Sequence, residues 1–251
     1  MKTIAIAGKG GTGKTTVAAL IIRLLSEKKR PILAVDADSN VNLNDVLGVE
    51  LEETIGAIRE ELKILTNKLP GGMSKQQFLE YKIQQSLVET PFFDLIAMGR
   101  PEGPGCYCYA NNLLRDILVT LSRNYEYVVI DNQAGMEHLS RRIAQDIDEL
   151  LIVSDPSLRG IHPAGKISRL AKELETRVKE KFLILNRVQD SIPVQLEKAV
   201  AEEGLRFLGF IPEDKKLLEM DQQGKSLWEI SADSTAYKAI VELYQKLIKM
   251  H

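Results

Sequence analysis

The 251-residue chain lacks the features of several common classes of protein. Its 2 cysteines are too few for a disulfide framework, so we expect a reducing compartment, the cytoplasm. No run of about 18 apolar residues occurs, and the N-terminal apolar run is too short for a signal peptide, which argues against a membrane partner or export. The 33 Lys and Arg residues against 35 Asp and Glu give a net charge of −2, which does not favour a nucleic-acid partner.

What the chain does contain is an ordinary globular composition, 44% apolar and 27% charged, with apolar runs between helical patterns. The continuous apolar runs predict strands covered on both faces, at 3–7, 32–35, 94–98, 127–130, 150–153, 182–185 and 207–211. The patterns between them predict helices at 15–27, 75–88, 113–123, 163–178 and 194–202. This alternation predicts an α/β fold, a single domain over residues 1–251 with a doubly wound, mostly parallel sheet and a helical insertion around 51–91.

The strongest motif is GKGGTGKTT at residues 8–16, which lies between the first predicted strand and the first predicted helix. It matches G-x-x-x-x-G-K-[ST], in which backbone N–H groups and the helix N-terminus bind phosphate oxygens. The residues predicted to bind nucleotide here are Gly10, Gly11, Thr12, Gly13, Lys14, Thr15 and Thr16. Thr15 is also predicted to bind Mg²⁺. The alternative is a glycine-rich turn that binds no nucleotide.

Lys9 places a second lysine at the start of this loop. With it the loop resembles that of the deviant Walker A ATPases, a family that includes the Min-system and plasmid-partition ATPases and the nitrogenase iron protein. The resemblance implies ATP hydrolysis by a homodimer in which Lys9 of one copy reaches the phosphates bound by the other, as an arginine finger does. The alternative is an exposed lysine beside a phosphate site, since position alone does not show which chain it serves.

Aspartates follow two of the predicted strands, where ligands of open α/β sheets bind. Asp36 and Asp38 share one face of the extended segment DAD, and Asp131 follows the fourth strand. The resemblance implies that Asp38 is catalytic and orients the attacking water, while Asp36 and Asp131 lie near Mg²⁺. The alternative for Asp38 is capping of a helix. The resemblance also places adenine contacts at Asn186 and Pro212.

Cys106 and Cys108 form a C-Y-C segment after a loop rich in glycine and proline. Two ligands of a tetrahedral metal site have sulfurs roughly 3.8 Å apart, which a slightly bent C-Y-C can reach. One chain then supplies half of a four-sulfur site and a second copy supplies the rest, with thiolates suited to nickel, zinc or copper(I). The alternative is two incidental buried cysteines.

Four segments together resemble the CooC-type ATPases: the phosphate loop, DAD, MGRPEGPGCYCY at 98–109 and DNQAGMEHL at 131–139. These ATPases insert nickel into carbon monoxide dehydrogenase, and close relatives serve acetyl-CoA synthase. The resemblance implies a metallochaperone ATPase that needs ATP and Mg²⁺ and forms a homodimer. It would bind Ni²⁺, or Zn²⁺, at Cys106 and Cys108, and hydrolyse ATP slowly without its client nickel enzyme.

Two other functions share the ATPase core. An ATP-dependent electron donor of the nitrogenase iron protein type would hold an iron–sulfur cluster, but the cysteines of that family lie far apart in sequence. A positioning ATPase of the Min or partition type would use a membrane or DNA surface. The C-terminal apolar stripe could serve such a membrane contact, but we expect it to cover the sheet; its residues are Ala236, Ile240, Leu243, Tyr244, Leu247 and Ile248.

Overall fold

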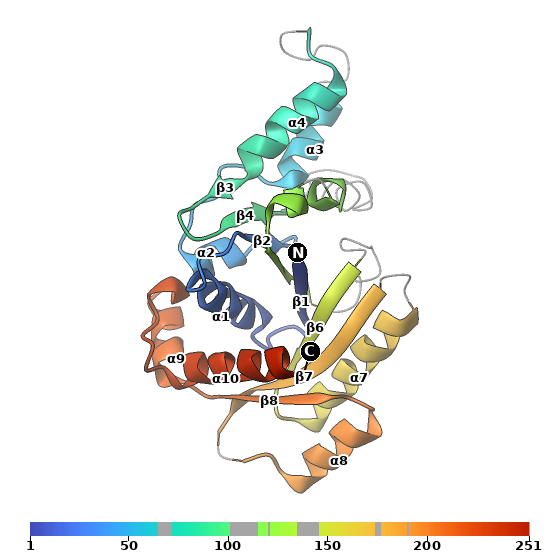
Figure 1. Ribbon diagram of the computed structural model, residues 1–251, viewed down its shortest axis with the longest axis vertical. Helices are drawn as coiled ribbons and strands as arrows, with labels where there is room; N and C mark the ends of the chain where they lie inside the picture. The colour runs from blue at the N-terminus through green and yellow to red at the C-terminus, as the bar shows by residue number, and fades with distance from the viewer. Residues whose placement is uncertain are drawn as a thin grey trace.

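The computed structural model describes residues 1–64, 72–100, 115–119, 121–134, 146–173, 177–189 and 191–250, and contains an eight-stranded sheet in the order β3-β4-β2-β5-β1-β6-β7-β8 (Figure 1). The strands are β1 (Lys2–Gly8), β2 (Ile32–Asp36), β3 (Val88–Glu89), β4 (Asp94–Ala97), β5 (Tyr127–Asp131), β6 (Asp146–Ser154), β7 (Arg177–Val188) and β8 (Phe207–Pro212). All pairs are parallel except β3 with β4. The predicted α/β fold with a mostly parallel sheet is confirmed.

Both faces of the sheet are buried. Successive side chains of each strand point to opposite sides, so one strand contributes to two core clusters. In β1, Ile4 and Ile6 belong to one core cluster while Ala5 and Ala7 belong to the other. The helices that contribute to the first cluster are α1 (Lys14–Ser26), α2 (Leu43–Leu47) and α10 (Thr235–Lys249), with α9 (Lys215–Gln222) packed against it. Those that contribute to the second are α3 (Ile55–Ile64), α7 (Leu158–Glu173) and α8 (Val194–Glu202), together with the helical residues 115–119. The sheet is therefore the middle layer, with one set of helices on each face.

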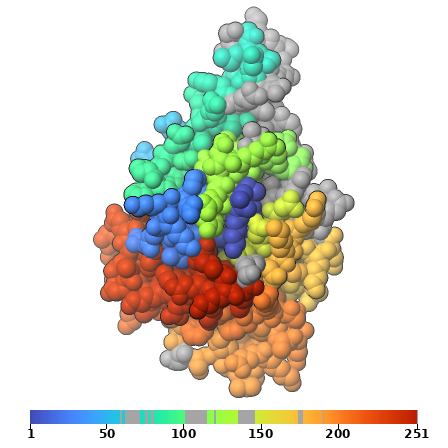
Figure 2. Space-filling view, in the orientation of Figure 1, coloured from blue at the N-terminus to red at the C-terminus, as the bar shows by residue number. Residues whose placement is uncertain are grey.

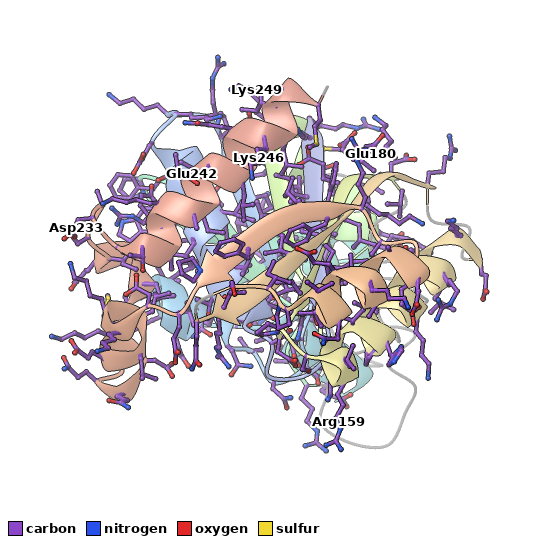
Figure 3. All side chains as sticks on the ribbon, turned by 90° about the horizontal axis from the view of Figure 1, so that it is seen from below. Arg159, Glu180, Asp233, Glu242, Lys246 and Lys249 are labelled. Carbon is purple, nitrogen blue, oxygen red and sulfur yellow. The ribbon has the colours of Figure 1, made fainter. Side chains whose placement is uncertain are left out.

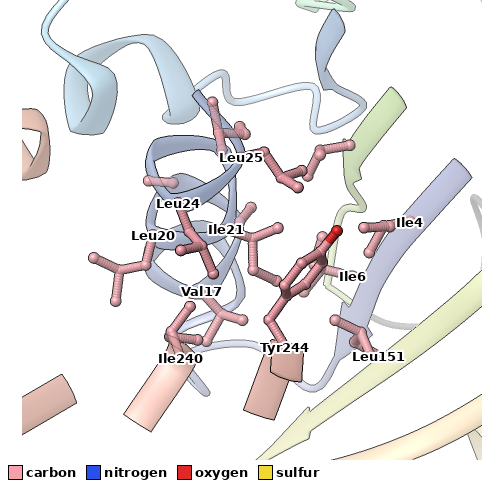
Figure 4. Packing of buried hydrophobic residues seen from close by; sticks show 14 of the residues in the cluster. Ile4, Ile6, Val17, Leu20, Ile21, Leu24, Leu25, Leu151, Ile240 and Tyr244 are labelled. Carbon is pink, nitrogen blue, oxygen red and sulfur yellow. The ribbon is translucent and has the colours of Figure 1, made fainter. Parts of the chain in front are cut away.

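Helix α10 covers the sheet beside α1, as expected from its apolar stripe. Ile240 and Tyr244 pack against Ile4, Ile21 and other residues of the first cluster (Figure 4). Ile248 is the exception, since 49% of it is exposed. The charged residues Glu242, Lys246 and Lys249 lie on the exposed side of the helix (Figure 3). The stripe is thus used in the core, and no helix among the described residues is long and apolar enough to cross a membrane.

Helices α3 and α4 (Lys75–Ser86) lie in the 51–91 region, where the sequence predicts a helical insertion. They project from the β3 and β4 side of the sheet (Figure 1), and α4 rises above the rest of the molecule in the space-filling view (Figure 2). A capping box between Ser74 and Gln77 starts α4. Lys82 links α4 to α3 and the segment before it through ion pairs with Glu61 at 2.7 Å and Glu53 at 3.3 Å.

Several predicted boundaries were wrong. The helix predicted at 163–178 is α7, which begins at Leu158 and ends at Glu173, so that Pro163 lies inside it and residues 177–178 begin β7. The helix predicted at 75–88 ends at Ser86, and Val88 belongs to the antiparallel strand β3, which the sequence did not predict. Of the helix predicted at 113–123, the described residues 115–119 and 121 are helical and 122–124 form a 3-10 turn, η2 (Ser122–Asn124). Helices α2 and α9 and the 3-10 turn η3 (Leu227–Glu229) were not predicted.

Candidate functional site

The phosphate-binding loop joins the carboxyl end of β1 to the start of α1, as its motif requires. Gly11 and Gly13 have φ values of +78° and +87°, in the left-handed region that favours glycine. Gly13 is the N-cap of α1, so the loop turns directly into the helix N-terminus. Its exposed residues are Lys9, Gly10 and Gly11, while Thr12 and Lys14 are buried. The loop therefore presents its backbone at the positive end of the α1 dipole.

Hydrogen bonds to backbone carbonyls hold the loop in shape. Thr12 Oγ1 donates to the Lys9 carbonyl at 2.9 Å, and Lys14 Nζ donates to the same oxygen at 3.3 Å. From β7, Asn186 Nδ2 donates to the Thr12 carbonyl at 2.9 Å, and an Arg187 guanidinium nitrogen donates to the Gly11 carbonyl at 3.2 Å. The end of β7 is thus part of the loop's support. The Asn186 amide is engaged with the loop and with the Arg187 N–H. Its contact with adenine stays a prediction.

Lys14 and three aspartates form the electrostatic centre of the site. Lys14 is 8% exposed, and burial lowers the pKa of its ammonium group, while Asp131 and Asp38 act in the opposite direction. Asp36 and Asp131 occupy paired positions at the ends of the neighbouring strands β2 and β5. Parallel pairing therefore brings the carboxylates at 36, 38 and 131 next to the phosphate loop, as the sequence predicts.

Asp131 has the environment expected of a group that binds a cation. It is 2% exposed, and its Oδ1 atom has no hydrogen-bond partner in the described part of the chain. Its pKa is raised to about 7, mainly by burial and also by the neighbouring Asp36, although a hydrogen bond with Thr15 and the charge of Lys14 act to lower it. A buried carboxylate oxygen beside a threonine hydroxyl fits Mg²⁺, which takes hard oxygen ligands. Thr15 and Asp131 therefore lie together, and their binding of Mg²⁺ stays a prediction.

Asp36 is fully buried and uses both carboxylate oxygens to order the loop after β2. Oδ1 accepts from the Asp38 N–H, and Oδ2 accepts from the N–H groups of Asn42 and Leu43, all at 2.9 Å. Burial raises the pKa of Asp36, and these three N–H donors lower it in part. The sequence predicts Asp36 to lie near Mg²⁺, and the structure adds that it fixes the path from 38 to 43 and the start of α2.

The loop that carries Asp38 has local contacts and one unusual backbone angle. Asp38 is partly exposed, and its Oδ1 accepts from the Asn40 N–H at 2.9 Å, which is a turn rather than the helix cap considered as the alternative. Val41 has φ +48°, a rare conformation for a β-branched residue. Gln133, which follows Asp131 by two residues, donates to Ser39 Oγ at 3.1 Å. The segments after β2 and β5 are thus in direct contact.

The other predicted residues differ in how far the structure describes them. Lys9 is exposed at the start of the loop, Thr16 lies in the first turn of α1, and Pro212 ends β8 next to Val188. Cys106 and Cys108 lie outside the described residues. Within the described ranges, no three His, Cys, Asp or Glu side chains are grouped so as to hold a metal ion.

A comparison with known families decides which ATP-binding family this site represents. The model of the CobQ/CobB/MinD/ParA nucleotide binding domain matches residues 3–227. The chain belongs to this family. Its match to the model includes the phosphate loop, all three aspartates and Asn186. The chain is thus an ATP-binding ATPase of the MinD/ParA type, which confirms the predicted P-loop ATPase.

Some relatives of the chain have names that state only ATP binding, and others have names that state a role. An uncharacterized ATP-binding protein of Methanocaldococcus jannaschii is 45% identical over 98% of the chain and 98% of its own length. The carbon monoxide dehydrogenase accessory protein CooC of Rhodospirillum rubrum is 30% identical over 91% of the chain and 90% of its own length. The MinD structure of Pyrococcus furiosus is 22% identical and superposes with a TM-score of 0.72. The match covers 100% of this chain and 99% of the MinD chain, which supports the fold.

The MinD/ParA site includes residues whose part the sequence did not predict. Asn132 is buried and donates from Nδ2 to the Ile6 carbonyl at 2.9 Å, which ties the end of β5 to β1 just before the phosphate loop. Arg187 has φ +59°, and this conformation accompanies its contact with the Gly11 carbonyl. The only signal in the sequence was their position directly after a strand, next to a predicted site residue.

The MinD/ParA loop allows a matched test at two glycines. A Cβ at Gly13 would lie 2.3 Å from Asn186 Nδ2, whereas one at Gly11 would meet nothing within 4 Å. Because both have positive φ, Gly11→Ala measures backbone strain alone, about 1 kcal/mol. Gly13→Ala also displaces the Asn186 amide, so we expect a loss of about 2–4 kcal/mol in unfolding free energy by urea denaturation. Equal losses in the two variants would contradict the role of Asn186.

Proposed function

We propose that this MinD/ParA ATPase is a nickel-delivery ATPase. Two copies pair around Mg-ATP, hold one nickel ion between their Cys106 and Cys108 thiolates, and release it to a client nickel enzyme such as carbon monoxide dehydrogenase or acetyl-CoA synthase. Nickel is the cargo in this scheme, and ATP hydrolysis is the event that ends the pairing. The ATPase part of this proposal is carried by one observation. Asp131 Oδ1 is buried beside Thr15 and has no hydrogen-bond partner among the described residues.

The chain's own residues account for phosphoryl transfer. The loop N–H groups and Lys14 bind the phosphates, while Thr15 and Asp131 hold Mg²⁺, which neutralises charge on the phosphate oxygens when bound. Asp38, partly exposed and on the same side as Asp131, orients the attacking water. An aspartate at this position suffices, because phosphoryl transfer depends on positioning more than on a strong base.

Pairing of two copies explains the exposed Lys9. Its carbonyl is engaged by Thr12 and Lys14, but the residue is exposed. In a pair, Lys9 would stabilise the transferring phosphoryl group bound by the partner copy, in the role of an arginine finger. The Gln133 contact with Ser39 links the two loops that would sense the phosphate, so hydrolysis can loosen the pair.

The cargo half of the proposal rests on the C-Y-C segment and on the relative named as a carbon monoxide dehydrogenase accessory protein, which is 30% identical. Two thiolates per chain give half of a tetrahedral site, so the metal and ATP favour the same pair of copies. By thermodynamic linkage, each must then tighten the binding of the other.

The experiment compares two variants with opposite expected effects. Replacing Cys106 and Cys108 with Ser should abolish nickel binding, because a hydroxyl is a poor ligand for this metal, and leave ATP hydrolysis largely intact. Asp38→Ala should do the reverse, with nickel retained and hydrolysis lost. Metal content after gel filtration and phosphate release measure the two activities. Stoichiometric nickel in the double Cys variant would refute the cargo site.

The same preparation separates the two alternatives. An electron donor with an iron–sulfur cluster would contain iron when purified without oxygen, whereas the nickel carrier would contain nickel and no iron. A positioning ATPase would sediment with liposomes or DNA in its ATP form. The buried stripe of α10 argues against a membrane contact through that helix, because Ile240, Leu243 and Leu247 are in the core.

A further inference from the structure

A cavity of about 670 Å³ lies at the end of the sheet opposite to the nucleotide site. It is bounded by the carboxyl end of α1 and the starts of β2 and β4, and η3 closes it through Trp228. The strand β2 runs from Ile32 at this cavity to Asp36 at the nucleotide site. Its size is within the range of pockets that bind small molecules. Nothing in the ATPase scheme above uses it.

One wall of the cavity is aromatic. Phe92 is 53% exposed, and its ring centroid lies 5.3 Å from that of Trp228 at an interplanar angle of 39°. Phe93 packs behind at 5.0 Å from Trp228. Exposure of a phenylalanine at the mouth of a cavity leaves a ring face open to a flat ligand.

The cavity is also cationic. Arg23, Lys29 and Arg30 line it. Arg23 donates to the Trp228 carbonyl, but its Nε has no hydrogen-bond partner among the described residues, and no ion pair of Arg23 or Lys29 occurs there. Arg30 pairs at 3.1 Å with Glu126, but both side chains are largely exposed, so that pair is weak.

The acidic groups of the lining are already engaged. Asp94 accepts the Tyr125 hydroxyl at 2.5 Å, and Glu27 accepts the Tyr237 hydroxyl at 2.5 Å. Burial and the hydrogen bond with Asp94 both raise the pKa of Tyr125, which keeps that hydroxyl a donor. The cations of the cavity therefore exceed the acids in number, and the acids have partners.

We propose that this cavity is a second ligand site, for a small planar molecule that carries an anionic group. The planar part packs against Phe92 and Trp228, and the carboxylate, sulfonate or phosphate faces Lys29 and Arg30. The site is separate from the phosphate loop and does not depend on the nickel proposal.

Trp228 is the only tryptophan of the chain, so its fluorescence reports on this cavity. The probe is 8-anilinonaphthalene-1-sulfonate, an anion with a planar naphthalene ring system, added to protein saturated with Mg-ADP so that the nucleotide site is blocked. We expect saturable quenching of Trp228 with one probe per chain. The double variant Lys29→Glu, Arg30→Glu should weaken binding about tenfold, because two attractive charges become repulsive.

The matched control is Lys166→Glu, Lys172→Glu, which changes the net charge equally on exposed positions of α7. It should bind the probe as the parent does. Binding that is equally strong in both double variants, or absent from the parent, would overturn the proposal.

A second measurement needs no variant. Iodide and caesium quench tryptophan by collision, so a cationic cavity should make quenching of Trp228 by iodide weaken, and quenching by caesium strengthen, as inert salt is added. Quenching by both ions that does not change with added salt would also overturn the proposal.

Discussion

Asp131→Asn is expected to weaken Mg-ADP binding by about 10- to 100-fold, the usual cost of losing a group that holds a metal through its water shell. The physical reason is the buried Oδ1, which has no partner among the described residues and is placed beside Thr15. Hydrolysis should fall at least in proportion. Isothermal titration with and without Mg²⁺ measures the effect, because binding of ADP without the metal should change little.

The same substitution is expected to stabilise the nucleotide-free protein. Burial raises the pKa of Asp131 from 3.8 to about 7, so between these values the folded state holds a proton that the unfolded chain releases. This contribution to stability is present below about pH 4 and is lost as pH rises through about 7. At pH 8 the ionised carboxylate therefore costs on the order of 4 kcal/mol, and Asn removes this cost.

The pH dependence provides the control. The gain in unfolding free energy of Asp131→Asn over the parent should be large at pH 8 and small at pH 4, by urea denaturation without nucleotide. Mg-ADP binding to the parent should weaken as pH falls below 7, because the metal must displace the proton. A variant that is less stable than the parent at pH 8 would contradict the assigned environment of Asp131.

Asp36→Ala is expected to be the most destabilising substitution in the site. It removes the acceptor of three backbone N–H groups, from Asp38, Asn42 and Leu43, in a fully buried place. Unsatisfied buried donors cost about 1–3 kcal/mol each, and partial rearrangement of the loop limits the total to about 3–5 kcal/mol. Chemical denaturation measures it directly.

Asp36→Asn is the matched control, because it keeps the shape and one oxygen. That oxygen can still accept from Asn42 and Leu43, but the amide group would face the Asp38 N–H as a second donor. The loss should therefore lie between zero and that of Asp36→Ala. If Asp36→Ala unfolds at the denaturant concentration of the parent, the carboxylate does not hold the loop.

The parts of the molecule that were predicted from the sequence depend on local patterns. The phosphate loop at 8–16 was predictable because a short motif stands between a strand and a helix, and the structure places it there. The two carboxylates Asp36 and Asp131 were predictable as neighbours because parallel strands end together, and their strands do pair in register.

What was missed depends on contacts between distant residues or on the cost of a single proline. Asn186 supports Thr12 across 174 positions, and no local pattern indicates that bond. Pro163 was taken as the start of a helix, yet α7 begins five residues earlier, since a proline in the second turn removes only one backbone hydrogen bond. Asp36 was predicted only as a residue near Mg²⁺. The three backbone N–H groups that donate to it come from the loop after β2, and no local sequence pattern indicates how that loop folds.

The most direct test of the central claim is the ratio of nickel to chain in the species that forms with a non-hydrolysable ATP analogue, measured by light scattering and metal analysis of the same gel-filtration peak. The account predicts a dimer with one nickel ion per two chains, and tighter nickel binding with the analogue than without it. One nickel ion on each isolated chain, with the same affinity in both conditions, would contradict it.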